Sequence, residues 1–323
     1  MVCLVGTPSG LTDLHIHGVE GFDTQTDSVA DILSIARLEG LEGVSEILLS
    51  LYPGPIPAMR RGLSAVKEAM EKQRSGFSGE TFASKVPHSQ PHTRPSARIL
   101  GAHLEGPFLN PTRCGALDPG TFLTPSWDAY RELAEGFADT IKVVTLAPEL
   151  RGAPELIKRI VNSGTIVTMG HTDATYTEAE AGFRAGARGV THLFNAMRPF
   201  THREPGIAGF ALTNPDVYVE IIADPHHLHL ETIRLVFRAK PRDRILIVSD
   251  SVKGTGAGAL GKEGRSGETG DAHLNPPVCT EAGNLRGGSM SITESSARLI
   301  QEGFDETAVM RAVIENPARL LHG

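Results

Sequence analysis

The chain of 323 residues has few cysteines, no long apolar run and no cluster of like charges. Cys3, Cys114 and Cys279 are too few and too widely spaced for a disulfide framework or a CxxC metal site, so we expect three inert thiols. No stretch approaches the roughly 20 consecutive apolar residues of a membrane helix, and the first residues lack the basic and apolar parts of a signal peptide. The expectation is a cytoplasmic protein without membrane contact.

The formal net charge of −7 is small and spread along the chain. Because nucleic-acid-binding proteins typically carry a basic patch, no nucleic-acid partner is expected, whereas an anionic small substrate held by one or two local cations is compatible with this charge. With 40% hydrophobic and 21% charged residues, the composition is that of a globular protein with a sizeable core.

Apolar, β-branched runs alternate with amphipathic segments along the sequence. The apolar runs predict eight strands, at Leu11 to His15, Ser45 to Leu49, Ile99 to Leu104, Lys142 to Leu146, Ile166 to Met169, Gly189 to His192, Tyr218 to Ile222 and Ile245 to Ser249. The amphipathic segments predict helices at Val29 to Glu39, Pro57 to Lys72, Ser126 to Phe137, Ala153 to Asn162, Tyr176 to Ala185, Leu230 to Lys240, Ile292 to Glu302 and Thr307 to Leu321. Alternation of this kind predicts a parallel sheet, and eight such units suit an α/β fold of the (β/α)8 TIM-like barrel type, ~250 residues in size.

The whole chain, residues 1–323, is therefore predicted to form a single barrel domain. Two stretches interrupt the alternation and are predicted to be loops, Gln73 to Ser96 and Lys253 to Asn275. His88 and His92 lie in the first loop and are interpreted as solvated histidines rather than metal ligands.

Five of the apolar runs end in a histidine or an acid. The sequences DLHIHG, GAHLEG, VTMGHT, VTHLFN and IVSD place His15, His17, Glu105, His171, His192 and Asp250 at predicted strand ends. In a parallel barrel these ends meet at one face, and His15 and His17 lie on the same side of their strand. Imidazole and carboxylate ligands suit Zn²⁺ or Fe²⁺, with Mn²⁺ or Co²⁺ as substitutes, and a carboxylate at Glu105 can bridge two ions. The sequence predicts a centre that could hold one or two divalent ions.

Asp250 has the residue type and position of a proton carrier beside a metal-activated water. Taken alone it would be interpreted as a helix cap or turn residue, but five candidate ligands favour the catalytic interpretation. His103 shares a strand face with Glu105, and we expect it to hydrogen-bond to the ligands rather than to bind an ion.

These residues lie in motifs that resemble the amidohydrolase superfamily and, more narrowly, the N-acetylglucosamine-6-phosphate deacetylase family. The resemblance runs from about Leu11 to Leu321 and depends on LTDLHIHG, GAHLEGPFLNPTRCGA, TLAPE, GHTDATYTEA, THLFNAM, REPGIAG, ADPHH, IVSD and GNLRGGSMSITE. It implies a (β/α)8 barrel that hydrolyses the acetamide of an amino sugar phosphate.

The resemblance also implies roles for individual residues. Glu105, His171 and His192 would bind the main ion, His15 and His17 would allow a second, and Asp250 would be the catalytic acid and base. Substrate contacts would come from Asn195, Ala196, Arg203 and His227. Arg203 and His227 suit a phosphate, because guanidinium binds two oxygens and imidazole adds a donor. The resemblance further implies a homodimer in which part of the phosphate site comes from the neighbouring subunit.

The chain departs from the family pattern at three places. The family's small accessory β-sandwich is expected to be missing or truncated, because the barrel begins near Met1 and the chain stops at Gly323. Pro225 stands where the family has the glycine of ADG, and Leu117 stands where it has the histidine of GAH. Three alternatives stay open: deacetylation of another N-acetyl sugar phosphate, hydrolysis of a cyclic amide, or a catalytically silent barrel that binds a sugar phosphate.

Overall fold

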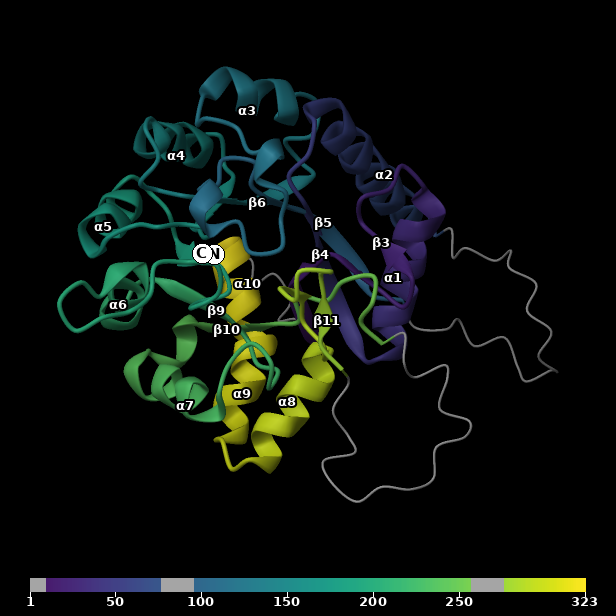
Figure 1. The fold of residues 1–323 in the computed structure, drawn as a ribbon. Coiled ribbons are helices and arrows are strands. Elements are labelled where there is room, and N and C mark those ends of the chain that lie inside the picture. The colour runs from purple at the N-terminus through teal and green to yellow at the C-terminus, as the bar shows by residue number, and fades with distance from the viewer. Residues whose placement is uncertain (1–9, 77–95, 257–275) are drawn as a thin grey trace, which may run out of the picture.

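Eight parallel strands form the centre of the fold, in chain order around the sheet. They are β1 (Leu11–Ile16), β4 (Val44–Leu51), β5 (Arg98–Glu105), β6 (Ile141–Leu146), β7 (Ile166–Met169), β8 (Gly189–Val190), β9 (Tyr218–Ile222) and β10 (Ile245–Val248). The computed structural model describes residues 10–76, 96–256 and 276–323 (Figure 1). Ile16 bridges Ser251 in parallel and the Asp250 N–H donates to the His15 carbonyl at 2.9 Å, which joins the two edges of the sheet. The predicted TIM-like barrel is confirmed.

Helices surround this sheet (Figure 1). They are α1 (Val29–Leu41), α2 (Ile56–Arg74), α3 (Trp127–Ala134), α4 (Ala153–Asn162), α5 (Tyr176–Arg184), α6 (Gly206–Thr213), α7 (Leu230–Ala239), α8 (Ile292–Gln301), α9 (Glu306–Val313) and α10 (Glu315–His322). Several begin at side-chain caps that the sequence encodes. Thr175 with Glu178 and Ser291 with Glu294 form capping boxes at α5 and α8, which satisfy backbone N–H groups that a helix start leaves free.

Apolar side chains fill the space on both sides of the strands. The larger cluster lies between strands and helices, while a smaller one contains Leu14, Leu48, Tyr218 and Leu246 and includes Leu320 of α10. Every residue of β9 and β10 is buried. Burial on both faces is typical of parallel strands covered by helices.

Two short antiparallel pairs follow the first and last barrel strands. They are β2 (Gly18–Val19) with β3 (Phe22–Asp23), and β11 (Val278–Cys279) with β12 (Leu285–Gly287). Within the described residues, no helix is long and apolar enough to cross a membrane.

The sequence misplaced several element boundaries. The predicted strand to His192 ends at Val190, because His192 has a φ of +33° and lies in a turn. The predicted helix from Thr307 to Leu321 is two helices, since Pro317 has no N–H to bond the Val313 carbonyl. The helix α6 was missed: its sequence is apolar almost throughout and buried, so it has no amphipathic period.

The predicted loops also differ in part from the structure. Gln73 belongs to α2, and its side chain accepts a hydrogen bond from the Ile99 N–H and donates one to the Ala97 carbonyl. His88, His92 and most of the second predicted loop lie outside the described residues.

Candidate metal centre and active site

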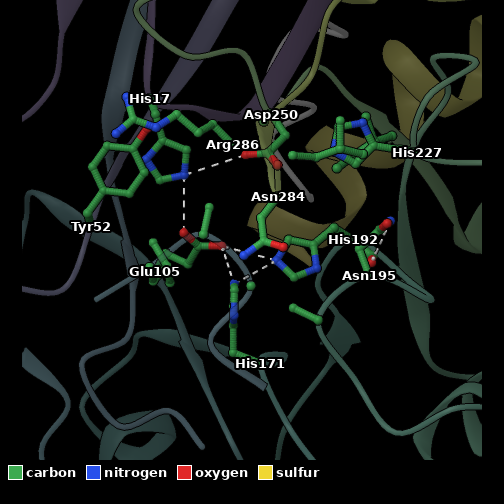
Figure 2. A pocket seen from close by; sticks show the side chains of 17 residues that line it. His17, Tyr52, Glu105, His171, His192, Asn195, His227, Asp250, Asn284 and Arg286 are labelled. Atoms are coloured by element: carbon green, nitrogen blue, oxygen red, sulfur yellow. Dashed lines mark hydrogen bonds and ion pairs between the residues drawn. The ribbon is translucent and has the colours of Figure 1, made fainter. Parts of the chain in front are cut away.

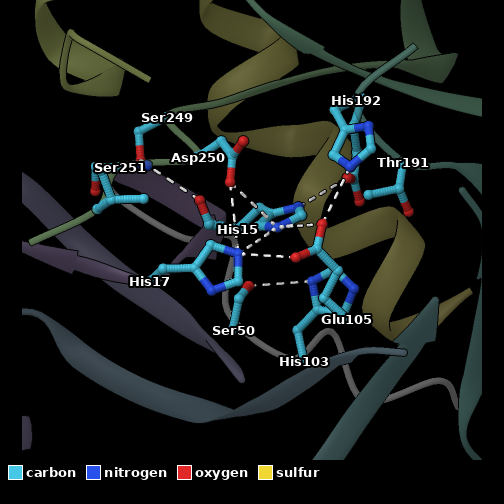
Figure 3. Close-up of polar contacts among 12 residues, drawn as sticks. His15, His17, Ser50, His103, Glu105, Thr191, His192, Ser249, Asp250 and Ser251 are labelled. Atoms are coloured by element: carbon cyan, nitrogen blue, oxygen red, sulfur yellow. Dashed lines mark hydrogen bonds and ion pairs between the residues drawn. The ribbon is translucent and has the colours of Figure 1, made fainter. Parts of the chain in front are cut away.

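The strand ends bring six predicted side chains together at one face of the barrel (Figures 2 and 3). These are His15, His17, Glu105, His171, His192 and Asp250, and all six are buried. They form two groups whose potential ligand atoms converge: Glu105, His171 and His192 make one, and His15, His17 and Asp250 make the other.

Glu105 joins the two groups. Its Oε1 lies 3.1 Å from both His171 Nε2 and His192 Nε2, and those two nitrogens are 3.1 Å apart. Its Oε2 lies 3.2 Å from His17 Nε2. One carboxylate therefore faces imidazoles of both groups, the arrangement that a ligand bridging two ions requires.

In the second group, the nitrogens of the HxH motif point to the same place. His15 Nε2 and His17 Nε2 are 3.1 Å apart and lie 3.4 and 3.5 Å from Asp250 Oδ1. Because residues two apart on a strand face the same side, β1 and the residue after it supply both imidazoles.

The hydrogen bond of His171 supports a cation at the first group. Its Nδ1 lies 2.9 Å from the Arg113 carbonyl, which only accepts, so Nδ1 carries the proton. In the neutral ring, Nε2 then presents a lone pair to Glu105 and His192. Lone pairs facing one another in a buried site repel unless a positive charge lies between them, so these three side chains fit a divalent metal ion.

The buried carboxylates of the centre also favour the binding of a cation. Burial raises the pKa of Asp250 well above its ordinary value, and the neighbouring carboxylates of Glu105, Asp13 and Glu220 raise it further. Burial would likewise raise the pKa of Glu105. With no ion between them, positive charge on His171 and hydrogen bonds from His17, His171 and His192 outweigh burial and hold that pKa well below its ordinary value, a task that a bound cation would take over while the rings stay neutral.

Two further polar residues lie behind the ligands. Glu220 Oε2 is 3.4 Å from His15 Nδ1, and this buried acid in the apolar strand YVEII was not singled out from the sequence. His103 does not join either group: its Nε2 lies 2.7 Å from Thr145 Oγ1 and its Nδ1 lies 3.2 Å from Ser50 Oγ. Its ring meets that of His15 edge-on, with 4.6 Å between centroids.

A cavity of about 260 Å³ opens above the six side chains (Figure 2). Asn195, Ala196 and His227 line it, as does Leu117. His227 Nδ1 is 2.9 Å from Asp224 Oδ2. Burial would raise the pKa of Asp224, but the hydrogen bond and charge of His227 and the Ser289 N–H lower it to about 2. Asp224 therefore stays ionised at neutral pH, accepts a hydrogen bond from His227 and so orients its ring.

Arg203 is the one predicted substrate residue that the structure does not bring to this cavity. It is exposed and absent from the cavity lining. Tyr52, Asn284 and Arg286 line the cavity instead and were not assigned a role from the sequence. Tyr52 stacks on the ring of His17 with 3.8 Å between centroids. Arg286 lies in the quoted motif GNLRGGSMSITE, and only folding shows that this motif reaches the cavity.

The chain is similar in sequence to known deacetylases of N-acetyl amino sugar phosphates. No protein-family profile matches the chain. An N-acetylgalactosamine-6-phosphate deacetylase of Escherichia coli O157:H7 is 29% identical over 310 residues, which cover 96% of this chain and 76% of that protein. An N-acetylglucosamine-6-phosphate deacetylase of Bacillus subtilis is 35% identical over 250 residues, or 76% of this chain. The chain is a homologue of the N-acetylglucosamine-6-phosphate deacetylases.

Solved structures of these deacetylases have the same fold. A variant of the Mycobacterium smegmatis enzyme in complex with N-acetyl-D-glucosamine-6-phosphate has a TM-score of 0.79 at 26% identity, covering 98% of this chain and 77% of that one. The Thermotoga maritima enzyme also has a TM-score of 0.79 at 26% identity, covering 98% and 78%. The Bacillus match spans 58% of that deacetylase's length.

Proposed function

We propose that the chain is a metal-dependent deacetylase that hydrolyses N-acetylglucosamine 6-phosphate to glucosamine 6-phosphate and acetate. The observation that carries the proposal is the convergence of Glu105, His171 and His192 beneath a cavity, in a homologue of enzymes with that activity. The proton carrier expected of such an enzyme, Asp250, lines the same cavity.

Glu105, His171 and His192 would hold the main ion, and His15, His17 and Asp250 would allow a second. Zn²⁺ or Fe²⁺ suits this mixture of imidazole and carboxylate ligands best, and Mn²⁺ or Co²⁺ are expected to substitute. When bound, such an ion polarises a carbonyl and lowers the pKa of water to ~7.

Asp250 would move the protons of the reaction. Its carboxylate would accept a proton from the attacking water, so that a C–O bond forms at the acetamide carbon. The same group would then deliver that proton to the amine nitrogen as the C–N bond breaks, which releases acetate and the free amino sugar. Leu117, where the family has a histidine, has no donor for the developing oxyanion.

Asn195, Ala196 and His227 would hold the sugar phosphate. Asn195 Nδ2 faces the carbonyls of His192 and Leu193, at 3.3 and 3.4 Å, which leaves its Oδ1 to accept from a sugar hydroxyl. His227 donates from Nδ1 to Asp224, and with both ring nitrogens protonated its Nε2–H would donate to a phosphate oxygen.

Arg203 would serve the site of a partner subunit in a homodimer. The exposure of Arg203, and of Phe200 at 55%, supports an interface at this segment. A monomeric protein with full activity, seen by sedimentation, would rule out this part of the proposal. A cytoplasmic location suits a phosphorylated sugar and the low cysteine content.

The first prediction concerns Asp250. Asp250→Asn keeps the shape of the side chain but cannot take a proton, so kcat should fall roughly 10²- to 10⁴-fold. Acetate release from N-acetylglucosamine 6-phosphate by purified, metal-loaded protein measures this effect. Asp128→Asn, an exposed acid on α3, is the control for lost charge.

The unphosphorylated sugar is the second substrate of this experiment and should be a poor one. If folded, metal-loaded wild-type protein releases no acetate from the phosphorylated sugar, the proposed function is wrong.

The Escherichia coli match supports a second candidate, deacetylation of N-acetylgalactosamine 6-phosphate, because it covers 96% of this chain. The two sugars differ in the orientation of one hydroxyl. Comparing kcat/KM for both in the same assay decides between them.

A further inference from the structure

One guanidinium faces the cavity, and it is not the arginine that the sequence singled out. Among the described residues that line the cavity, Arg286 is the only lysine or arginine. It is exposed, and no carboxylate of the described residues forms an ion pair with it. Figure 2 shows its side chain reaching over the wall formed by His17 and Tyr52. A cation in this position is available for a ligand.

Two glycines determine where Arg286 lies. It belongs to β12, and the next residues, Gly287 and Gly288, lie directly against the segment that contains Asp250. The Gly288 N–H donates to the Asp250 carbonyl at 2.7 Å. A Cβ on Gly287 would come within 2.4 Å of the Asp250 carbonyl oxygen, and one on Gly288 within 1.9 Å of that of Ser249. This close approach, possible only for glycine, brings Arg286 to the rim of the cavity.

The residues that follow β12 are linked to His227 through Asp224. The Ser289 N–H donates to Asp224 Oδ2 at 2.9 Å, and Asp224 also orients His227. Arg286 and His227 are therefore held through one short stretch of backbone. Both line the cavity, Arg286 beside His17 and Tyr52 and His227 across the site from it (Figure 2).

The cavity has carboxylates at its floor and an arginine, Arg286, at its rim. The floor contains the carboxylates of Glu105 and Asp250, whose negative charge would be offset by the divalent ions that they would help to hold. Arg286 is the arginine that the lining leaves free to meet a phosphate group at the rim.

We propose that Arg286 is the cation with which this chain, from its own subunit, binds the phosphate group of its substrate. The guanidinium can donate two parallel hydrogen bonds to phosphate oxygens, which neither a lysine nor a histidine can match. The proposal deepens the proposed function, on which it rests, by making Arg286 a residue that selects phosphorylated sugars.

The test replaces the charge and leaves a polar side chain. Arg286→Gln should raise KM for N-acetylglucosamine 6-phosphate roughly 10- to 100-fold, the loss of one charge-assisted contact, with little change in kcat. Activity on the unphosphorylated sugar should stay at the wild-type level. Arg238→Gln on α7, which removes an exposed charge away from the cavity, is the matched control, and metal content and melting temperature confirm that each variant is intact.

Inorganic phosphate is the second probe. It should inhibit the wild type and the Arg238→Gln variant equally, and the Arg286→Gln variant more weakly. An equal loss on both sugars, or no loss on either, would overturn the proposal. If the wild type hydrolyses neither sugar, the proposed function fails separately, and calorimetric binding of N-acetylglucosamine 6-phosphate to both variants then decides the role of Arg286.

Discussion

Three of the six residues at the centre adopt a backbone conformation that side chains rarely take. His171, His192 and Asp250 have φ values of +46°, +33° and +49°, and each lies just after a barrel strand. Left-handed non-glycine residues cost of order 1–3 kcal/mol and cluster at functional sites. At these positions the chain leaves its strand while the side chain still faces the centre (Figures 2 and 3). The surrounding packing sustains the strain, and the result is a ligand set directed to one point.

The buried acid Glu39 makes the stability of the protein depend on pH. Burial raises the pKa of Glu39 to about 8, and Asp13, Glu42 and Glu20 add to the effect. The folded protein then keeps a proton that the unfolded chain, with its ordinary value of 4.5, releases as pH rises. The free energy of unfolding should therefore fall between pH ~4.5 and ~8, by up to about 1.4 kcal/mol per pH unit from this group.

Glu39→Gln, which stays neutral, should remove this contribution. Its stability relative to the wild type should grow over that range and level off above it, which urea unfolding at a series of pH values measures. Glu71→Gln on the exposed face of α2 controls for the lost charge. A stability difference that does not change with pH would contradict the assignment.

Site residues that end an apolar run could be found in the sequence. Site residues without such a position could not. His15, His17, Glu105, His171, His192 and Asp250 were visible because each ends an apolar run. Glu220 lies in the middle of a strand and meets His15 across 205 residues, so its role depends on closure of the barrel. Arg203 was chosen by motif, but the structure leaves it outside its own chain's cavity.

Among the elements, β12 contributes to the site although it is only three residues long. It lies outside the barrel and carries Arg286 to the cavity. Just after it, the Gly288 N–H donates to the Asp250 carbonyl and the Ser289 N–H donates to Asp224, the partner of His227. No hydrophobic period marks so short a strand. The long helices and the barrel strands have such periods, which is why the sequence located them within a few residues while missing β12 and α6.

Gly288, the residue after β12, lies so close to the Ser249 backbone that adding a single methyl group should have a measurable effect. Gly288→Ala places a Cβ 1.9 Å from the Ser249 carbonyl oxygen, so backbone must move. We expect a loss of about 1–3 kcal/mol in the free energy of unfolding, as for other overpacked sites, with a fall in kcat because Asp250 shifts. Thermal unfolding and acetate release measure the two effects.

Gly54→Ala is the matched control, since its Cβ would meet nothing closer than Met59 Cγ at 3.9 Å. Wild-type stability and kcat in the Gly288→Ala variant would show that β12 does not set the position of Asp250.

At the scale of the whole molecule, the barrel gathers side chains that are far apart in the sequence. His15 and Asp250 meet because the ends of β1 and β10 are joined, and Glu105 meets His171 and His192 across the interior. The fold thereby concentrates carboxylates and imidazoles in a buried centre whose charge favours a divalent cation. Metal binding and catalysis are thus consequences of the same closure.

The rate of acetate release from N-acetylglucosamine 6-phosphate by chelator-treated protein, before and after addition of Zn²⁺, tests this account most directly. The account predicts no release from the stripped protein and restored release once the ion is added, because Glu105, His171 and His192 would then hold it. Undiminished release from protein shown to contain no divalent metal would contradict the account.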